Sequence, residues 1–131
     1  MVDILKKRLD CTFEEALETV KKKIEKEFSI LMVKSIDGVI RKKLDLPEYP
    51  VKYTTILACG PEIAKMSLDI SMDIGTLMPC SFVVYEDKGE VFVAHISIMK
   101  IASELEIAGG EEMKPVIEKT GEKVKKVWEE L

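Results

Sequence analysis

The sequence predicts a single α+β domain with a mostly antiparallel sheet of about five strands. Two β-rich segments, 80–86 and 90–97, are separated by the short turn EDKGE and indicate a hairpin. Amphipathic helical segments alternate with further β-rich runs before and after that hairpin. The chain has 131 residues, of which 47% are hydrophobic, which is enough for one core and too few residues for two ordinary domains. We therefore treat residues 1–131 as one domain.

The first predicted elements are a strand over 2–9 and a helix over 11–28. The strand prediction depends on partial alternation of apolar and polar residues. The helix prediction has two supports, a capping box formed by Thr12 and Glu15 and an apolar stripe at helical spacing. That stripe consists of Phe13, Ala16, Leu17, Val20, Ile24 and Phe28.

A second strand is predicted over 29–36, where the run SILMVKSI is rich in β-branched and large apolar residues. The Asp-Gly pair at 37–38 could close a hairpin. Apolar residues spaced four apart instead favour a short helix over 39–44; they are Ile36, Ile40 and Leu44.

The middle of the chain is predicted to contain a strand, a helix and a connector. Apolar and polar side chains alternate over 51–60, which is typical of a strand. Pro61 suits the first position of a helix over 61–70, because the missing N–H has no partner there. Residues 71–79 form the connector that leads to the hairpin.

After the hairpin we expect two more helices. Gly89 occupies the position in the turn that favours a left-handed backbone. A short helix is predicted over 98–105 and is ended by a Gly-Gly pair. The closing helix over 113–131 presents one apolar stripe, formed by Met113, Val116, Ile117, Val124, Val127, Trp128 and Leu131.

The hairpin suggests which side chains share a face of the sheet. If Glu86 pairs with Glu90, one face carries Cys80, Phe82, Val84 and Phe92, and we expect helices to cover it. The opposite face would then be unusually apolar for a surface that meets water. We therefore expect a two-fold homodimer through that face, with the C-terminal helix or a loop as the alternative cover. The candidate dimer residues are Val83, Tyr85, Val91, Val93 and His95.

Composition excludes several classes of function. The net charge is −4 and the pI is about 5.2, so a general nucleic-acid-binding surface is not expected. No segment resembles a signal peptide or a membrane span, which predicts a cytoplasmic protein without a membrane partner. The chain contains neither Asn nor Gln and is rich in Lys and Glu, a composition typical of proteins from very hot environments.

Two of the three cysteines lie beside prolines and define the candidate binding pocket. Cys59, Gly60 and Pro61 open the middle helix, and Met78, Pro79 and Cys80 precede the hairpin. A helix start favours a thiolate or a bound anion. The simpler interpretation is that both cysteines are small core residues.

Metal, cofactor and catalytic motifs are not found in the sequence. There is no CxxC or HxxH spacing, and His95 is the single histidine, so we expect no metal site and no cofactor. Phosphate-loop, dinucleotide-binding and nucleophile-elbow patterns are lacking as well, so no catalytic residue is assigned. The sequence leaves open whether the protein is an enzyme, and the lack of catalytic motifs favours a protein without catalytic activity.

Two alternatives remain for the chemistry. The first is a thiol-dependent redox protein or enzyme, with Cys59 as the reactive thiolate and Cys80 as its partner. The second is a haem or soft-metal binding protein that uses His95 with a methionine or a cysteine. The predicted register disfavours the second alternative, because it places Cys80 and His95 on opposite faces of the sheet.

Two long stretches resemble the DUF302 family of domains of unknown function. They are TFEEALETVKKKIEKEFSILMVKSID and ILACGPEIAKMSLDISMDIGTLMPCSFVVYEDKGEVFVAHIS. The resemblance extends from Thr12 to the final helix. Its most specific elements are Met78-Pro79-Cys80, Ala58-Cys59-Gly60-Pro61, and Asp37 after the second strand. This chain departs from the family pattern at Gly60, where Asn is usual, and at Glu27, where Gly is usual.

The resemblance implies a fold like that of the TATA-box-binding protein, with a curved antiparallel sheet and helices on one side. It also implies a dimer. It does not imply DNA binding, because fold does not determine function and this chain is acidic. Together these observations predict a small homodimeric module that binds an unknown small ligand without catalytic activity.

Overall fold

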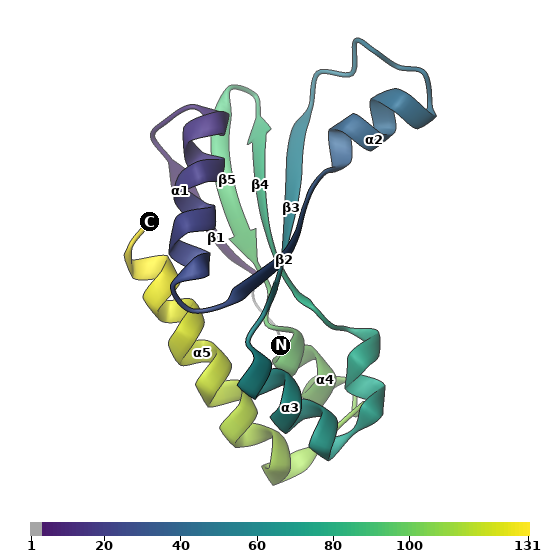
Figure 1. The fold of residues 1–131 in the computed structure, drawn as a ribbon, viewed down its shortest axis with the longest axis vertical. Coiled ribbons are helices and arrows are strands. Elements are labelled where there is room, and N and C mark those ends of the chain that lie inside the picture. The colour runs from purple at the N-terminus through teal and green to yellow at the C-terminus, as the bar shows by residue number, and fades with distance from the viewer. Residues whose placement is uncertain (1–3) are drawn as a thin grey trace.

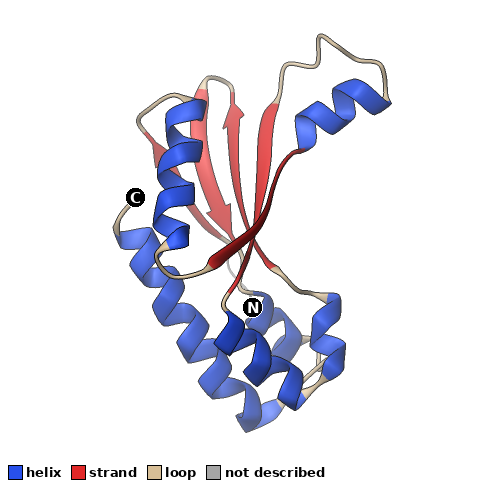
Figure 2. Ribbon diagram, viewed as in Figure 1, coloured by secondary structure: helices blue, strands red, loops and turns tan. Residues whose placement is uncertain are grey.

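The computed structural model describes residues 4–131, which form one five-stranded antiparallel sheet with helices packed against it (Figure 1). The strand order is β1-β5-β4-β3-β2, and the sheet is open and strongly twisted (Figure 2). The strands are β1 (Leu5–Leu9), β2 (Ser29–Ser35), β3 (Lys52–Cys59), β4 (Cys80–Asp87) and β5 (Glu90–His95). The predicted α+β class and the order of the elements are confirmed. Residues 2 and 3 of the predicted first strand lie outside the described residues.

Five α-helices connect and cover the strands in this part of the chain. They are α1 (Phe13–Glu25), α2 (Ile36–Lys43), α3 (Pro61–Ile70), α4 (Ile98–Glu104) and α5 (Lys114–Glu129), with short 3₁₀ turns at Met72–Thr76 and Gly110–Met113. The predicted capping box of α1 is present, since Glu15 N–H donates to Thr12 Oγ1 at 3.1 Å. Helix α5 runs past α3 and α4 to α1 (Figure 1). No helix among residues 4–131 has the length and apolar character needed to span a membrane.

The hairpin differs from the prediction by one residue. Asp87 pairs with Glu90, and Lys88 and Gly89 form a two-residue turn with φ of 52° and 81°. Positive φ at both central residues is the geometry that best follows the twist of paired strands. The expected pairing of Glu86 with Glu90 would have needed a three-residue loop. The predicted register is therefore wrong, and each predicted face mixes residues from both sides.

The corrected register divides the candidate dimer residues between the two faces of the sheet. Val91, Val93 and His95 lie on the face packed against the helices and are only 3%, 0% and 4% exposed. Val83 and Tyr85 lie on the other face, which we call the outer face, and are half-buried. The first three are thus core residues, and only the last two are available to a partner.

The same correction reverses the expected relation of Cys80 and His95. Phe82 pairs with His95, so Cys80 and Phe82 share the helix-covered face with the His95 ring. Phe92, which was expected on that face, lies on the outer face opposite Tyr85. The register argument against joint ligation by Cys80 and His95 therefore fails.

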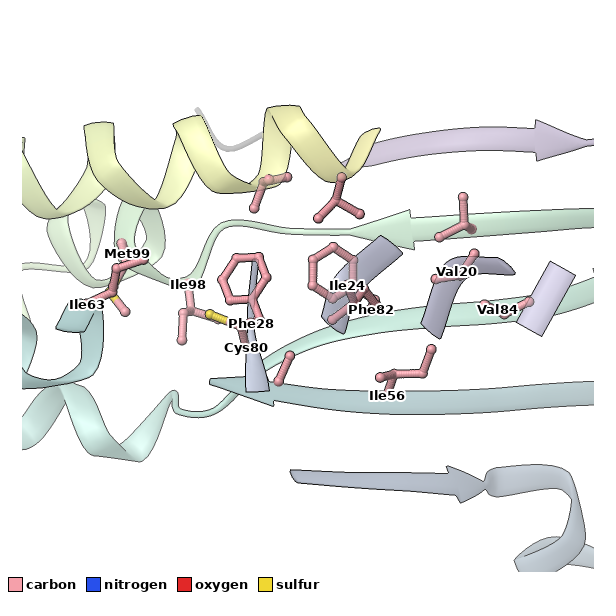
Figure 3. Packing of buried hydrophobic residues seen from close by; sticks show 14 of the residues in the cluster. Val20, Ile24, Phe28, Ile56, Ile63, Cys80, Phe82, Val84, Ile98 and Met99 are labelled. Carbon is pink, nitrogen blue, oxygen red and sulfur yellow. The ribbon is translucent and has the colours of Figure 1, made fainter. Parts of the chain in front are cut away.

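The hydrophobic core lies between α1 and the covered face. Phe28 meets Phe82 edge to face with ring centroids 5.9 Å apart. Figure 3 shows the side chains of α1 against those of β3 and β4, with Cys80 beside Phe28 and Ile98. Such close packing fixes the position of α1 on the sheet. The residues labelled there include Val20, Ile24, Ile56, Ile63, Val84 and Met99.

Helix α2 stands apart from the other helices at the end of β2 (Figure 1). Asp37 attaches it to the sheet: its carboxylate accepts hydrogen bonds from Tyr53 N–H at 2.9 Å and Ser35 Oγ at 3.0 Å, and it forms an ion pair with Arg41. Arg41 also donates to the Tyr49 and Val51 carbonyl oxygens at 3.0 and 2.7 Å. Burial alone would raise the pKa of Asp37, but these hydrogen bonds lower it overall. The aspartate that helped to identify the family resemblance is thus a structural anchor.

Candidate functional site

The pocket predicted from the cysteine-proline motifs is filled by side chains. Cys59, Gly60, Met78, Pro79 and Cys80 do come together, at the ends of β3 and β4. The space between them and the neighbouring core residues is only about 10 Å³, roughly enough for one water. Pro61 is not part of its lining. As arranged here, the motif closes one end of the core instead of opening a ligand site.

The two cysteines lie near each other but differ in exposure. Burial, and then the neighbouring Cys59, raise the pKa of Cys80 to about 11. Its thiol is therefore protonated at neutral pH, when a reactive cysteine must be a thiolate. Cys59 is partly exposed, Cys11 is exposed, and all three cysteines are free.

A metal site of protein ligands needs several donor side chains close together. Nowhere in residues 4–131 do three or more His, Cys, Asp or Glu side chains gather to hold a metal ion. Cys80 and His95 share a face, but His95 pairs with Phe82, two residues along β4 from Cys80, and the Phe82 ring stacks on the His95 ring with 4.3 Å between centroids.

The structure contains a cleft of about 480 Å³ that the sequence did not predict. It lies between α5 on one side and β1, the end of β5 and the start of α4 on the other, and we call it the α5 cleft. This volume falls in the range of small-molecule sites. The lining residues are Leu5, Lys7, His95, Ser97, Lys100, Ile117, Thr120, Gly121, Val124, Lys125, Trp128 and Glu129.

His95 is the unusual member of this cleft wall. Its Nδ1 lies 2.8 Å from the Ser81 carbonyl oxygen, which can only accept, so Nδ1 carries the proton. Burial lowers the pKa of His95, with partial compensation from that hydrogen bond, so the ring is neutral at pH 7. Nε2 is then a hydrogen-bond acceptor, and it is buried with no partner among the described residues. A buried polar atom without a partner is costly and calls for an explanation.

Gly121 is the second unusual member, because it lies in the interior of α5. A glycine there destabilises a helix by about 1 kcal/mol relative to alanine. A Cβ at this position would meet no atom within 4 Å, so packing does not require a glycine. Gly121 lines the cleft, and the absence of a side chain there leaves that part of it open.

The remaining polar groups of the wall are mostly occupied. Lys7 Nζ donates to the main-chain oxygens of Trp128 and Leu131 at 3.0 and 3.1 Å, which attaches the end of α5 to β1. Thr120 Oγ1 donates to the Val116 carbonyl oxygen at 2.8 Å. The Lys7 bonds join the two sides of the cleft, and the Thr120 bond lies within α5. His95 Nε2 is the buried side-chain polar atom without a partner within residues 4–131.

A shallower hollow of about 410 Å³ lies on the outer face of the sheet. Tyr53, Tyr85 and Phe92 form a ladder of stacked rings there, with 5.5 Å between successive centroids. Lys6 Nζ lies above the Tyr85 and Phe92 rings at 5.7 and 5.5 Å. Val83, one of the candidate dimer residues, lines the same hollow.

Comparisons with known proteins agree on the fold. A family model for the domain of unknown function DUF302 matches residues 5–131. The crystal structure of an uncharacterized conserved DUF302 protein from Bacillus stearothermophilus aligns with a TM-score of 0.83, covering 97% of this chain and 96% of that one. The two sequences are 15% identical, so the likeness concerns the fold alone. No curated protein matches the chain.

Proposed function

The chain belongs to the DUF302 family, and we propose that it is a small-ligand-binding module that acts without catalytic chemistry. The ligand site is the α5 cleft. The observation that carries this proposal is the buried, neutral His95 ring in the cleft wall, whose Nε2 has no hydrogen-bond partner among residues 4–131. Nε2 is covered by the surrounding side chains, so a ligand with an O–H or N–H group in the cleft supplies that partner only when those side chains move aside.

Gly121 supports the same site independently. A glycine in a helix interior lowers helix stability. Gly121 is exposed and lines the cleft, so the lack of a side chain there widens the cleft at the expense of helix stability. Two features that are unfavourable for folding thus occur in the lining of one cleft, on its opposite sides.

The state of Cys80 disfavours its role as the partner thiol of Cys59 in the thiol-based alternative. A pKa of about 11 leaves its thiol unreactive at neutral pH. The described residues of the cleft wall include no cysteine, and its aliphatic and indole side chains suit binding better than bond breaking.

The sole tryptophan of the chain, Trp128, makes the proposal testable because it lines the cleft. The probe is 8-anilinonaphthalene-1-sulfonate (ANS), titrated while the Trp128 emission and the ANS emission are recorded. Gly121→Leu adds a large apolar side chain to the cleft lining, at a position where a Cβ meets nothing within 4 Å. Gly109→Leu is the matched control: a Cβ there also meets nothing within 4 Å, its φ is −119°, and it lies outside the cleft.

We expect ANS to bind wild type and Gly109→Leu at one site per chain, with quenching of Trp128. Gly121→Leu is expected to lose at least about 90% of that response, a tenfold loss of affinity or more. If Gly121→Leu binds ANS as wild type does, or if wild type does not bind it, the α5 cleft is not a ligand site.

We also propose that two copies of the chain associate. Most large exposed apolar side chains in the described structure lie in β2, α2 and the loop after α2, which we call the β2–α2 surface. They are Leu31, Met32, Val33, Ile36, Val39, Leu44 and Leu46, each 36–63% exposed. Exposed apolar side chains gathered in neighbouring elements favour a protein–protein interface. β2 is also an edge strand, whose unpaired main-chain groups favour pairing with another strand.

The β2–α2 surface continues onto the outer face of the sheet, since Met32 pairs with Leu57 of β3. Val83 and Tyr85 lie on that same face and stay candidates for the interface. A second copy suits both surfaces, because a two-fold dimer is the commonest closed assembly of identical chains.

Native mass spectrometry tests the dimer. Met32→Glu places a charge in the centre of the β2–α2 surface, where Met32 is 53% exposed. The control is Met72→Glu, a methionine that is 79% exposed on a distant 3₁₀ turn. We expect dimers for wild type and Met72→Glu and monomers for Met32→Glu. A monomeric wild type, or a dimeric Met32→Glu, contradicts this assembly.

A further inference from the structure

The α5 cleft has an apolar wall. Ile117, Val124 and Trp128 come from α5, and Leu5 comes from β1, directly opposite His95 in the strand register. Val124 is 5% exposed and Leu5 is 41% exposed, so apolar surface extends from the inner wall to the mouth. A ligand that fills this space needs an apolar body.

The charged residues around the same cleft are mostly basic, in a protein that is acidic as a whole. The lining contains three lysines and one glutamate, although the chain has a net charge of −4. A cluster of one sign in a cleft attracts ligands of the opposite sign. The local charge therefore favours an anion.

The three lysines differ in what they already bind. Lys7 Nζ donates to main-chain oxygens at the end of α5. Lys125 Nζ lies 3.8 Å from Glu129 Oε1, one helical turn further along α5. Lys100 is exposed at the start of α4 and forms no ion pair within residues 4–131. In the described part of the chain, its ammonium group is therefore the free cation at the cleft.

We infer that the α5 cleft binds an amphipathic organic anion, with the apolar body against Trp128 and its neighbours and the anionic group at Lys100. This inference rests on the proposed ligand-binding function of the cleft. It adds the chemical class of the ligand and the residue that selects its charge.

The test uses three eight-carbon probes that differ only in their head group: octanoate, octan-1-ol and octylammonium. Each is titrated against ANS bound to the wild-type protein, and its displacement of ANS is measured with Trp128 emission as a second readout. Lys100→Glu reverses the proposed selecting charge. Lys43→Glu is the control, because Lys43 is exposed on α2, outside the cleft.

We expect octanoate to displace ANS at a lower concentration than octan-1-ol, with octylammonium the weakest. Lys100→Glu should weaken the binding of octanoate about three- to tenfold and strengthen the binding of octylammonium. A change of this size is expected for one partly exposed charge. Lys43→Glu should change the affinity for octanoate and for octylammonium by no more than about twofold.

The outcomes separate this inference from the function on which it rests. If ANS binds wild type but not Gly121→Leu, and octanoate displaces it no better than the other two probes, the cleft is a ligand site without charge selection. The inference then fails alone. An unchanged order of the probes in Lys100→Glu also refutes it. If ANS binds Gly121→Leu as it binds wild type, the proposed function fails as well.

Discussion

Replacing Gly121 by alanine should stabilise the protein. A Cβ at this position meets nothing within 4 Å, so the change adds no clash and little packing. The gain is then the difference in helix propensity, about 1 kcal/mol. The unfolding entropy of a 131-residue chain is about 0.28 kcal/mol/K, on the basis of about 2.1 cal/mol/K per residue. The expected rise in Tm is therefore about 3–4 °C.

The matched control is Gly38→Ala, at the other glycine that lies within an α-helix of the described structure. A Cβ on Gly38 would lie 2.9 Å from Ser35 Oγ, the group that caps α2 by accepting from Gly38 N–H. This variant should gain nothing or lose stability, because loss of the N-cap, typically about 1 kcal/mol, offsets the gain in helix propensity. Both variants can be compared by thermal and urea unfolding followed by circular dichroism. Destabilisation by Gly121→Ala would refute the argument that the glycine has no packing role.

Three other properties can be checked on the unmodified protein. The single histidine, His95, should titrate below its ordinary pKa of 6.5 in NMR spectra. Between pH 6.5 and the lowered pKa of His95 in the folded protein, only the unfolded chain binds a proton at this ring. The free energy of unfolding should therefore fall by up to about 1.4 kcal/mol for each unit by which the pH is lowered through this range. A folded pKa of 6.5 or higher would exclude the neutral ring. Cys80, with a pKa of about 11 against 9.0, should react with iodoacetamide at pH 7 about 100-fold more slowly than a peptide cysteine. If Cys80 in the folded protein reacts as fast as a cysteine in an unstructured peptide, its thiol is accessible to solvent and the assignment of Cys80 to the core is wrong. The absence of Asn and Gln predicts a Tm above about 70 °C, and a value of about 45–65 °C would argue against a thermophilic origin.

The order of elements was predictable because local signals agree with the global fold. Three of these signals depend on neighbouring residues alone. They are the capping box at Thr12, the proline at the start of α3 and the helical spacing of apolar residues in α5. The hairpin register depends on a finer choice. EDKGE allows a loop of two or three residues, and only the positive φ of Lys88, uncommon for lysine, shows which is used. That one-residue difference moved His95 from the expected outer face to the core.

The candidate site was harder to predict for a different reason. The α5 cleft joins residues more than a hundred positions apart, such as Lys7 and Trp128, and its volume depends on how α5 tilts across β1. One signal was present in the sequence: Gly121 interrupts an otherwise regular amphipathic helix. The cysteine-proline motifs were more conspicuous, but a Cβ added to Gly60 would lie 3.2 Å from Ile63 Cδ1, which indicates tight core packing.

The most direct test of the central claim is the NMR signal of the His95 ring while ANS is added. The chain has one histidine, so its ring gives one set of resonances. If the α5 cleft is the ligand site, the Hε1 signal beside Nε2 shifts with the same saturation curve as the quenching of Trp128. An unmoved His95 signal at saturating ANS would show that the ligand binds elsewhere and would contradict the assignment of the cleft as the ligand site.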